Sequence, residues 1–217
     1  MSSRELFVKV CGITRLQDAD LAAELGASAI GFIFWPGSPR YIAPERAREI
    51  VRRKSPGVKA VGVFVDEPVE DVRRIAEVAG LDVVQLHGRE SAEYCREVSA
   101  FRWTAANGEV ARVIKSVTLR DGSPVDLGEF DDAVVMLLDA HDPERHGGTG
   151  RTIDWGVARG VAASRRTILS GGLNPGNIGG AIAAVHPYGV DVSSGVESAP
   201  GTKDAILLKS FFEALHD

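Results

Sequence analysis

Short apolar segments alternate with helix-like segments along almost the whole chain, and this alternation limits the possible folds more than any other feature. In the first cycle, an apolar strand over Leu6–Cys11 leads through a helix that ends at Gly26 to a second strand over Ala29–Trp35. Strands that are apolar at nearly every position are typical of parallel strands buried on both faces. The sequence therefore predicts consecutive βαβ units that build a parallel sheet.

The same pattern continues to the last helix and predicts eight strands in all. They are expected at Leu6–Cys11, Ala29–Trp35, Lys59–Val65, Asp82–Leu86, Arg112–Leu119, Ala133–Leu138, Thr167–Leu169 and Gly189–Val192. The connection between the fifth and sixth strands is rich in Gly, Pro and Asp, so a stunted helix is expected there. We predict one α/β domain over residues 1–217, a closed parallel (β/α)₈ TIM barrel. An open doubly wound sheet is the alternative, because periodicity alone does not establish closure.

Several residues mark where helices should begin. Thr14 and Gln17 fit a capping box, in which the hydroxyl and the amide each satisfy a free backbone N–H group. The other expected starts are Pro44, Pro68, Ser91, Asp154, Asn174 and Thr202. The spacing of the apolar residues in the last helix puts one buried face on Leu208, Phe211, Phe212 and Leu215.

Charge and cysteine content exclude several classes of protein. The net charge of -5 leaves no basic face for a nucleic acid, and no run approaches the roughly 18 apolar residues of a membrane span. Two cysteines, Cys11 and Cys95, are too few to stabilise a chain of this size through disulfide bonds, so both are expected as thiols in the cytoplasm. The His residues lack metal-ligand spacing and no GxGxxG motif opens a helix, so neither a metal nor a dinucleotide cofactor is expected.

Polar residues end two strands at the face where such barrels carry their sites. Cys11 ends the first strand before Gly12, and alternation puts Lys9 on the same face one layer below, where its charge favours a thiolate. Asp139 ends a strongly apolar strand, and burial of that kind raises the pKa of a carboxyl group enough for a general acid. Cys11 and Asp139 are therefore the candidate base and acid. The alternatives are a buried structural thiol and a carboxylate that only organises the next loop.

Two Gly-rich segments follow the seventh and eighth strands, "LSGGLNPGNI" and "VDVSSGVE". Glycine lets backbone N–H groups approach an anion closely, and the corresponding loops of (β/α)₈ barrels form phosphate sites. The sequence therefore predicts that these two segments bind a phosphate group.

Four further features are candidates with a weaker pattern. Arg40, in "PGSPRYI", can hold a carboxylate with its planar guanidinium group, and His87, in "LHG", can donate to a ligand. A solvated arginine and a structural histidine are the alternatives. The Gly-rich run His146–Gly150 is predicted to be a lid. The segment Phe101–Ala111 has no clear periodicity and is expected to be peripheral, with a partner surface as the alternative.

Segments spread over most of the chain share a wider pattern. They are "VKVCGIT", "GFIFWPGSPRYI", "VGVFVDEP", "VVQLHG", "LLDAHDPERHGGTGRTIDW", "LSGGLNPGNI" and "YGVDVSSGVESAPGTKD". Taken together, in this order, they closely resemble the phosphoribosylanthranilate isomerase family of tryptophan biosynthesis.

The resemblance implies an Amadori rearrangement of N-(5'-phosphoribosyl)anthranilate to 1-(2-carboxyphenylamino)-1-deoxyribulose 5-phosphate, with no cofactor and no obligate protein partner. It implies that Asp139 protonates the furanose ring oxygen, that Cys11 then removes the C2' proton and that Arg40 holds the anthranilate carboxylate. The two Gly-rich segments match those that hold the phosphate, which the resemblance assigns to Gly171, Gly172, Ser194 and Gly195. Asp191 aligns with an acidic residue of the family and shares a face with Ser193, so we count it with His87 among the substrate-binding candidates.

Two other kinds of protein remain as alternatives. Indole-glycerol-phosphate synthase would place a catalytic lysine near the end of the third strand, where this chain has "GVFVD", and the histidine-pathway sugar isomerase would have an aspartate in place of Cys11. A non-catalytic barrel that binds a phosphorylated metabolite is the alternative from another class, and the presence of both Cys11 and Asp139 argues against it.

Overall fold

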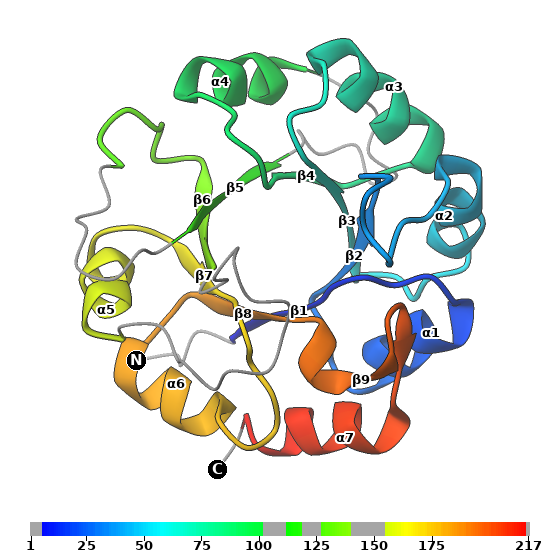
Figure 1. Cartoon of the computed structure of the whole chain (residues 1–217), viewed down its shortest axis with the longest axis vertical. Coiled ribbons are helices and arrows are strands. Elements are labelled where there is room, and N and C mark those ends of the chain that lie inside the picture. Colours follow the sequence, from blue (N-terminus) through cyan, green and yellow to red (C-terminus); the bar gives the residue numbers. More distant parts are fainter. Residues whose placement is uncertain (1–5, 102–111, 119–126, 140–154, 216–217) are drawn as a thin grey trace.

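The strands predicted from the sequence form one closed ring (Figure 1). The structure, a computed structural model, describes residues 6–101, 112–118, 127–139 and 155–215. Within these ranges eight parallel strands follow one another around the ring in chain order, and the last pairs with the first. The strands are β1 (Phe7–Val10), β2 (Ala29–Ile33), β3 (Lys59–Phe64), β4 (Val83–Leu86), β5 (Arg112–Thr118), β6 (Val135–Asp139), β7 (Thr167–Leu169) and β8 (Gly189–Val192). The predicted barrel is confirmed, and the open sheet is wrong.

Helices surround the ring on its outer side (Figure 1). They are α1 (Leu16–Glu24), α2 (Pro44–Val51), α3 (Val69–Ala79), α4 (Ala92–Ala100), α5 (Trp155–Ser164), α6 (Ile178–Val185) and α7 (Ala205–Glu213). Between β5 and β6, residues 127–134 form turns and bends. Residues 119–126 lie outside the described ranges, so the stunted helix expected in this connection stays a prediction. The segments predicted as a lid and as a peripheral or partner surface also lie outside those ranges, apart from Phe101.

Three of the expected helix starts hold. Pro44 is the first residue of α2, and Pro68 is the residue that precedes α3. The Ser91 hydroxyl accepts a hydrogen bond from the backbone N–H of Tyr94 at 3.2 Å and so caps α4. Asp154 lies outside the described ranges.

The capping box at the first helix is wrong. Helix α1 begins at Leu16 after Arg15, and no side chain caps it. The Thr14 hydroxyl instead donates to the carbonyl oxygen of Gly201 at 2.6 Å. A contact with a residue so distant in sequence satisfies the hydroxyl that a local pattern assigned to the helix.

Two other helices begin later than expected. Asn174 folds a turn in which its Oδ1 accepts from the Gly176 N–H at 2.9 Å, and α6 starts only at Ile178. Thr202 belongs to a short strand, β10 (Thr202–Lys203), which pairs with β9 (Glu197–Ala199). The cap of α7 is Asp204, whose carboxylate accepts from two backbone N–H groups.

The apolar side chains form two layers. Inside the ring lies a small cluster of Ala29, Val61, Val83, Ile114, Val135, Leu137 and Ile168. A larger cluster fills the space between the strands and the helices. As predicted for α7, Leu208, Phe211 and Phe212 are buried, and Leu215 packs against them while partly exposed.

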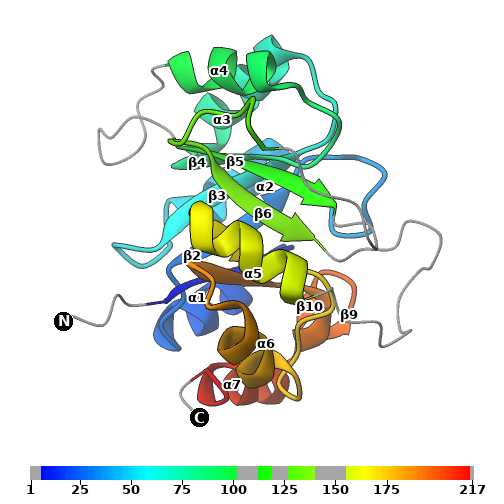
Figure 2. The same cartoon turned by 90° about the vertical axis from the view of Figure 1, so that its left-hand side faces the viewer.

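All eight strands point the same way, so their carboxyl ends lie at one end of the barrel. Figure 2 shows the arrowheads of β5 and β6 directed toward the side that carries β9 and β10. This end holds the loops that lead from strands to helices, where (β/α)₈ barrels place their sites. Among the described residues, no helix has the length and apolar character needed to cross a membrane.

Candidate active site

Toward the carboxyl ends of the strands, the barrel interior changes from apolar to polar. Alternate residues of a strand face the interior, and the apolar layer gives way to Lys9, Gln85 and Asp191, which are all buried. Two residues further along each of three strands, the interior ends in the sequence candidates Cys11, His87 and Asp139. The predicted base and acid therefore both lie at the same end of the ring, on strands separated by β7 and β8.

The Cys11 thiol occupies a space that a glycine on the next strand leaves open. Cys11 is 6 % exposed, and a Cβ atom added at Gly31 would lie 2.8 Å from its Sγ and 3.1 Å from Cε of Lys9. Burial raises the pKa of the Cys11 thiol above its ordinary value, whereas the Lys9 ammonium acts in the opposite direction. The thiol is thus largely desolvated, with a cation beside it.

Lys9 forms an ion pair inside the barrel. Its Nζ lies 2.9 Å from Oδ1 of Asp191, the residue paired with it in register across β1 and β8. The other oxygen of Asp191 accepts from the Ser170 hydroxyl at 3.3 Å. Burial alone would lower the pKa of Lys9, but Asp191 and Cys11 outweigh it and raise that pKa, so Lys9 stays charged.

A second buried cation, Lys203, binds the backbone carbonyl of Cys11. Nζ of Lys203, on β10, donates to the carbonyl oxygens of Cys11 at 2.5 Å and of Ser193 at 3.2 Å. It also pairs with Glu197 at 2.8 Å. The short β9–β10 hairpin therefore ties the end of β1 to the end of β8.

Glu197 connects this hairpin to Arg40. The Arg40 guanidinium group donates to both carboxylate oxygens of Glu197 at distances of 2.7 to 3.0 Å. Burial acts to raise the pKa of Glu197, but hydrogen bonds from Arg40 and Lys203 outweigh it and hold the pKa below its ordinary value. A Cβ atom added at Gly12, whose φ is +77°, would lie 2.6 Å from Cδ of Arg40. Gly12 therefore leaves room for the arginine to lie beside the Cys11 turn.

His87 reaches the predicted acid directly. Its Nε2 lies 3.2 Å from Oδ2 of Asp139, and its Nδ1 lies 3.0 Å from Nε2 of Gln85. The side chain of Asp139 is 13 % exposed and that of His87 is 34 % exposed. Gln85, His87 and Asp139 are thus connected side chain to side chain, and Gln85 is the most deeply buried of the three.

The two Gly-rich loops lie against each other. A Cβ atom at Gly195 would lie 1.9 Å from the carbonyl oxygen of Leu173, so only glycine fits where the loop after β8 meets the loop after β7. Gly171 and Gly172 both have positive φ, and a Cβ atom at Gly172 would meet nothing within 4 Å. None of the hydrogen bonds among the described residues uses the N–H groups of these two glycines.

The first of these loops is fixed by two amides. Nδ2 of Asn174 and Nδ2 of Asn177 each donate to the carbonyl oxygen of Gly172 at 3.0 Å. These two hydrogen bonds fix the Gly172 carbonyl in the turn whose N–H groups at Gly171 and Gly172 are unused. Unused backbone N–H groups are what an anion requires.

Three polar residues of this region were not predicted from the sequence. Glu197 and Lys203 lie on a hairpin that follows the last strand, and no local pattern connects them to Cys11 or Arg40. Gln85 could have been found by alternation, because it lies two positions before His87 on the same strand. No group of three or more His, Cys, Asp or Glu side chains suited to a metal occurs within the described ranges.

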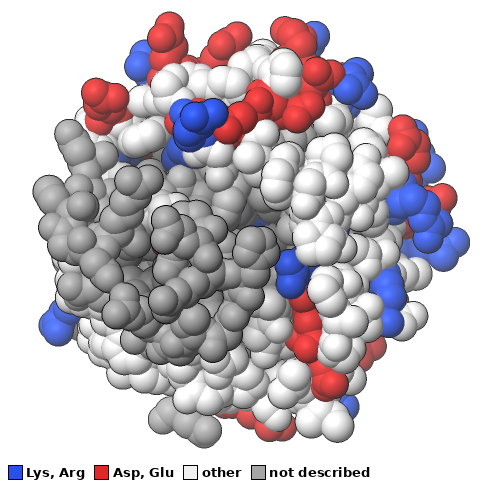
Figure 3. All heavy atoms as spheres, in the orientation of Figure 1, with Lys and Arg blue, Asp and Glu red and all other residues white. Residues whose placement is uncertain are grey.

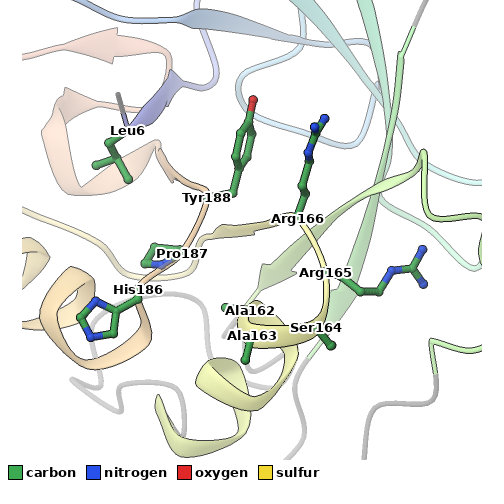
Figure 4. A pocket seen from close by; sticks show the side chains of 9 residues that line it. All are labelled: Leu6, Ala162, Ala163, Ser164, Arg165, Arg166, His186, Pro187 and Tyr188. Atoms are coloured by element: carbon green, nitrogen blue, oxygen red, sulfur yellow. The ribbon is translucent and has the colours of Figure 1, made fainter. Parts of the chain in front are cut away.

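A cavity lies at the opposite end of the barrel, away from these residues. It has a volume of about 400 Å³ and is lined by residues before β1, β7 and β8, including Leu6, Arg166 and Tyr188. Figure 4 shows Arg166 and Tyr188 projecting the same way, while Arg165 points away from the other labelled side chains. The Arg166 guanidinium group lies 5.8 Å from the centre of the Tyr188 ring. The residues that line this cavity do not bring an acid and a base, or a thiol and a base, together.

Charged side chains do not gather into one basic surface at the end of the barrel that carries the site. Figure 3 views this end and shows Lys and Arg interspersed with Asp and Glu, outside the parts drawn in grey. Many of the exposed charges pair within one helix, as Arg73 does with Glu70 and Arg74 with Asp71. The visible face is therefore of mixed charge.

Known proteins similar to this chain cover nearly all of it. Residues 8–214 match the family model described as N-(5'phosphoribosyl)anthranilate (PRA) isomerase. An N-(5'-phosphoribosyl)anthranilate isomerase of Pelobacter propionicus is 47 % identical over 204 residues, which are 94 % of this chain and 92 % of that protein. The crystal structure of phosphoribosyl anthranilate isomerase from Thermus thermophilus has a TM-score of 0.83 and 42 % identity, covering 97 % of this chain and 98 % of that one.

One similar structure contains a ligand. It is a phosphoribosyl anthranilate isomerase in complex with reduced 1-(o-carboxyphenylamino)-1-deoxyribulose 5-phosphate. Its TM-score is 0.80 at 39 % identity, and the alignment covers 98 % of this chain and 99 % of that one.

Proposed function

The chain belongs to the N-(5'-phosphoribosyl)anthranilate isomerase family, and we propose that Asp139 and Cys11 are the acid and the base of its reaction. The reaction is an Amadori rearrangement of N-(5'-phosphoribosyl)anthranilate, an aldose-to-ketose isomerisation within tryptophan biosynthesis. One observation carries the assignment. A buried thiol beside a cation and a carboxyl group 3.2 Å from an imidazole nitrogen lie at the carboxyl ends of two strands, at the same end of one barrel.

Asp139 acts first. Its carboxyl group gives a proton to the furanose ring oxygen while the bond between C1' and that oxygen breaks. The nitrogen lone pair of the anthranilate forms the new C=N bond, so the product is an open-chain, protonated Schiff base. The carboxylate left on Asp139 then accepts a hydrogen bond from His87, whose Nε2 lies 3.2 Å away.

Cys11 acts second. The iminium group acidifies the C2' hydrogen, and the Cys11 thiolate takes that proton. The C–H electrons form a C1'=C2' bond, and the C=N electrons return to nitrogen, which gives a neutral enolamine. The enolamine gains a proton at C1' and loses one from the C2' hydroxyl, so the overall change is an isomerisation.

The Lys9 ammonium supports this step because it favours the thiolate form of Cys11 over the thiol. Asp191, in turn, holds Lys9. We therefore assign Asp191 to the support of the base from within the barrel, and its expected direct contact with substrate stays a prediction.

Arg40 is assigned to the anthranilate carboxylate. One edge of its guanidinium group is held by Glu197, which fixes the plane of the group. The remaining N–H groups of Arg40 are free to form a paired interaction with a second carboxylate, for which guanidinium geometry is suited. This arrangement supports the assignment because a pre-positioned arginine orients the aromatic end of the substrate.

The phosphate is assigned to the loops after β7 and β8, through Gly171, Gly172, Ser194 and Gly195. The unused N–H groups of the first two glycines and the open space beside Gly172 support this assignment. The small phosphorylated molecule would thereby span the mouth of the barrel, with its phosphate at one side and its carboxylate at Arg40.

We also infer a cytoplasmic location and independence from an obligate protein partner, with no cofactor in the reaction. Support for the location comes from Cys11 and Cys95, which are both free thiols in the structure. Support for cofactor independence comes from the chemistry, because proton transfers alone convert the substrate to the product.

The proposal is tested by turnover of freshly prepared N-(5'-phosphoribosyl)anthranilate, followed as the loss of its anthranilate-type fluorescence. The wild-type protein should convert it, and Cys11→Ser and Asp139→Asn should each lower kcat by a factor of about 10² or more. The matched control is Cys95→Ala in helix α4, which should keep the wild-type kcat. Absence of wild-type turnover, or full activity in either site variant, would refute the assignment.

A further inference from the structure

The amide of Gln85 is an unusual feature of the barrel interior. Gln85 is 1 % exposed, its Nε2 lies 3.0 Å from Nδ1 of His87, and its Oε1 is buried without a hydrogen-bond partner among the described residues. Buried polar atoms are almost always paired, so an unpaired one calls for an explanation. Stability does not provide it, because an apolar side chain of similar size would leave no buried oxygen unpaired.

The contact with His87 has a chemical consequence. An amide NH₂ group donates hydrogen bonds and cannot accept them, so the Nδ1 that faces it must carry a lone pair. A neutral imidazole holds its single ring proton on the other nitrogen, Nε2. Nε2 is the atom that lies 3.2 Å from Oδ2 of Asp139.

We propose that Gln85 is a positioning residue that fixes the tautomer of His87, so that the imidazole presents an N–H donor to Asp139. The inference rests on the proposed function, in which Asp139 is the acid. When Asp139 has given its proton to the ring oxygen, the carboxylate that remains is stabilised by this donor. In the other tautomer, a nitrogen lone pair would face the carboxylate and repel it.

The unpaired oxygen follows from this arrangement. If the amide were turned by 180°, Oε1 would accept from an Nδ1–H group and would be paired, but Nε2 of His87 would then carry the lone pair toward Asp139. The orientation in the structure leaves the amide oxygen unsatisfied and gives Asp139 a donor. Gln85 thus lowers stability at one atom and, through His87 two residues further along the chain, orients the donor that faces the acid Asp139.

The first test compares stability with catalysis in Gln85→Leu. A merely structural glutamine would lower Tm when replaced. We expect Tm to be equal to or higher than that of the wild type, while kcat falls by about tenfold or more with KM nearly unchanged, as is typical when a supporting hydrogen bond is removed. The matched control is the same substitution at the exposed Gln17 of α1, which should change neither kcat nor KM. An unchanged kcat in Gln85→Leu would overturn the proposal.

The second test reads the tautomer without turnover. The ring nitrogens of His87 are observed by ¹⁵N NMR at alkaline pH, with the signal identified by its loss in His87→Asn. We expect an unprotonated Nδ1 in the wild type, a mixture of tautomers in Gln85→Leu and a protonated Nδ1 in Gln85→Glu, whose carboxylate accepts from that nitrogen. A protonated Nδ1 in the wild type would refute the inference.

These readouts separate the two proposals. A wild-type protein that does not isomerise N-(5'-phosphoribosyl)anthranilate but shows an unprotonated Nδ1 would refute the assigned function and leave the Gln85–His87 contact established. A wild type that turns over with the opposite tautomer would refute only the role of Gln85. Gln85→Glu nearly preserves the shape of the side chain, so it provides the same measurement if Gln85→Leu does not fold.

Discussion

Nζ of Lys9 and Oδ1 of Asp191 form a 2.9 Å ion pair within the barrel, next to the Cys11 thiol. The two residues are direct neighbours across β1 and β8, the strand pair that closes the ring. Two opposite charges in a dry interior stabilise one another, and removing one leaves the other buried and unpaired. The pair therefore fixes a positive charge beside the thiol without adding net charge to the interior.

Lys9→Met should raise the pKa of Cys11 still further above its ordinary value, because a nearby cation favours the thiolate and the unpaired Asp191 disfavours it. At a given neutral pH less thiolate is then present, so kcat should fall and its acidic limb should move to higher pH. The thiolate is measured by its ultraviolet absorbance against pH in a Cys95→Ala background, which leaves Cys11 as the sole cysteine.

The double variant Lys9→Met, Asp191→Leu separates the two charges. It removes the buried carboxylate along with the ammonium, so the thiol pKa and the free energy of unfolding should both return part of the way toward the wild type. Loss of one partner of a buried pair costs about 3–5 kcal/mol, whereas loss of both often costs little. If the single and double variants had the same thiol pKa as the wild type, Lys9 would have no part in activating Cys11.

Gly31→Ala tests the space in which the Cys11 thiol lies. The added Cβ atom would be 2.8 Å from Sγ, so the thiol or the strand must move. A displacement of about 1 Å of a reacting group can cost about 10² in rate, and we expect a fall of that size in kcat. Overpacking should lower stability by about 1–3 kcal/mol. Both quantities are read from steady-state kinetics and chemical denaturation.

The control for this variant is Gly160→Ala in α5, where an added Cβ atom would meet nothing within 4 Å. It should leave kcat unchanged, and stability should rise slightly because alanine favours a helix more than glycine does. A normal kcat in Gly31→Ala would show that the thiol does not need its position beside β2.

The barrel itself was predictable because its signal is local. Each strand is apolar on both faces over a few consecutive residues, and such runs are typical of buried parallel strands. Alternation along single strands also put Lys9 with Cys11 and Asp191 with Ser193 on shared faces. The pairing of Lys9 with Asp191 needed one further fact, the register of β1 against β8, which no local pattern contains.

The site contacts that the sequence does not predict, or predicts wrongly, likewise depend on long-range contacts. The local pattern at Thr14 predicts a helix cap, but the Thr14 hydroxyl donates to the carbonyl oxygen of Gly201, far away in sequence. Lys203 and Glu197 come close to Cys11 and Arg40 only because a short hairpin folds back over the ends of β1 and β8. Contacts between such distant segments depend on the closed fold, and the residue types alone give no sign of them.

Glu197→Gln should weaken substrate binding more than it slows the chemistry. The neutral amide cannot form the charged pair with Arg40, so the guanidinium group is no longer held in one plane. Charge-assisted hydrogen bonds contribute about 1.5–3 kcal/mol, so we expect KM to rise about tenfold with a smaller change in kcat. The matched control is Glu49→Gln, which removes an exposed pair with Arg46 on α2 and should leave KM unchanged.

Glu197 should also make the stability of the protein depend on acid pH. Its pKa is lower in the folded state than its ordinary value, because hydrogen bonds from Arg40 and Lys203 outweigh the opposing effect of burial. A carboxyl group of this kind stabilises the fold above its unfolded pKa, about 4.3 for glutamate, and this contribution is lost as the pH falls through the folded pKa.

The free energy of unfolding of the wild type should therefore exceed that of Glu197→Gln most clearly near neutral pH. The difference should shrink as the pH falls below about 4, since a protonated Glu197 carries no charge and resembles the glutamine. Denaturant titrations of both proteins at a series of pH values measure it, with Glu49→Gln as the control that shows no such trend. A constant difference across this range would mean that the charge of Glu197 does not hold Arg40 and Lys203 in place.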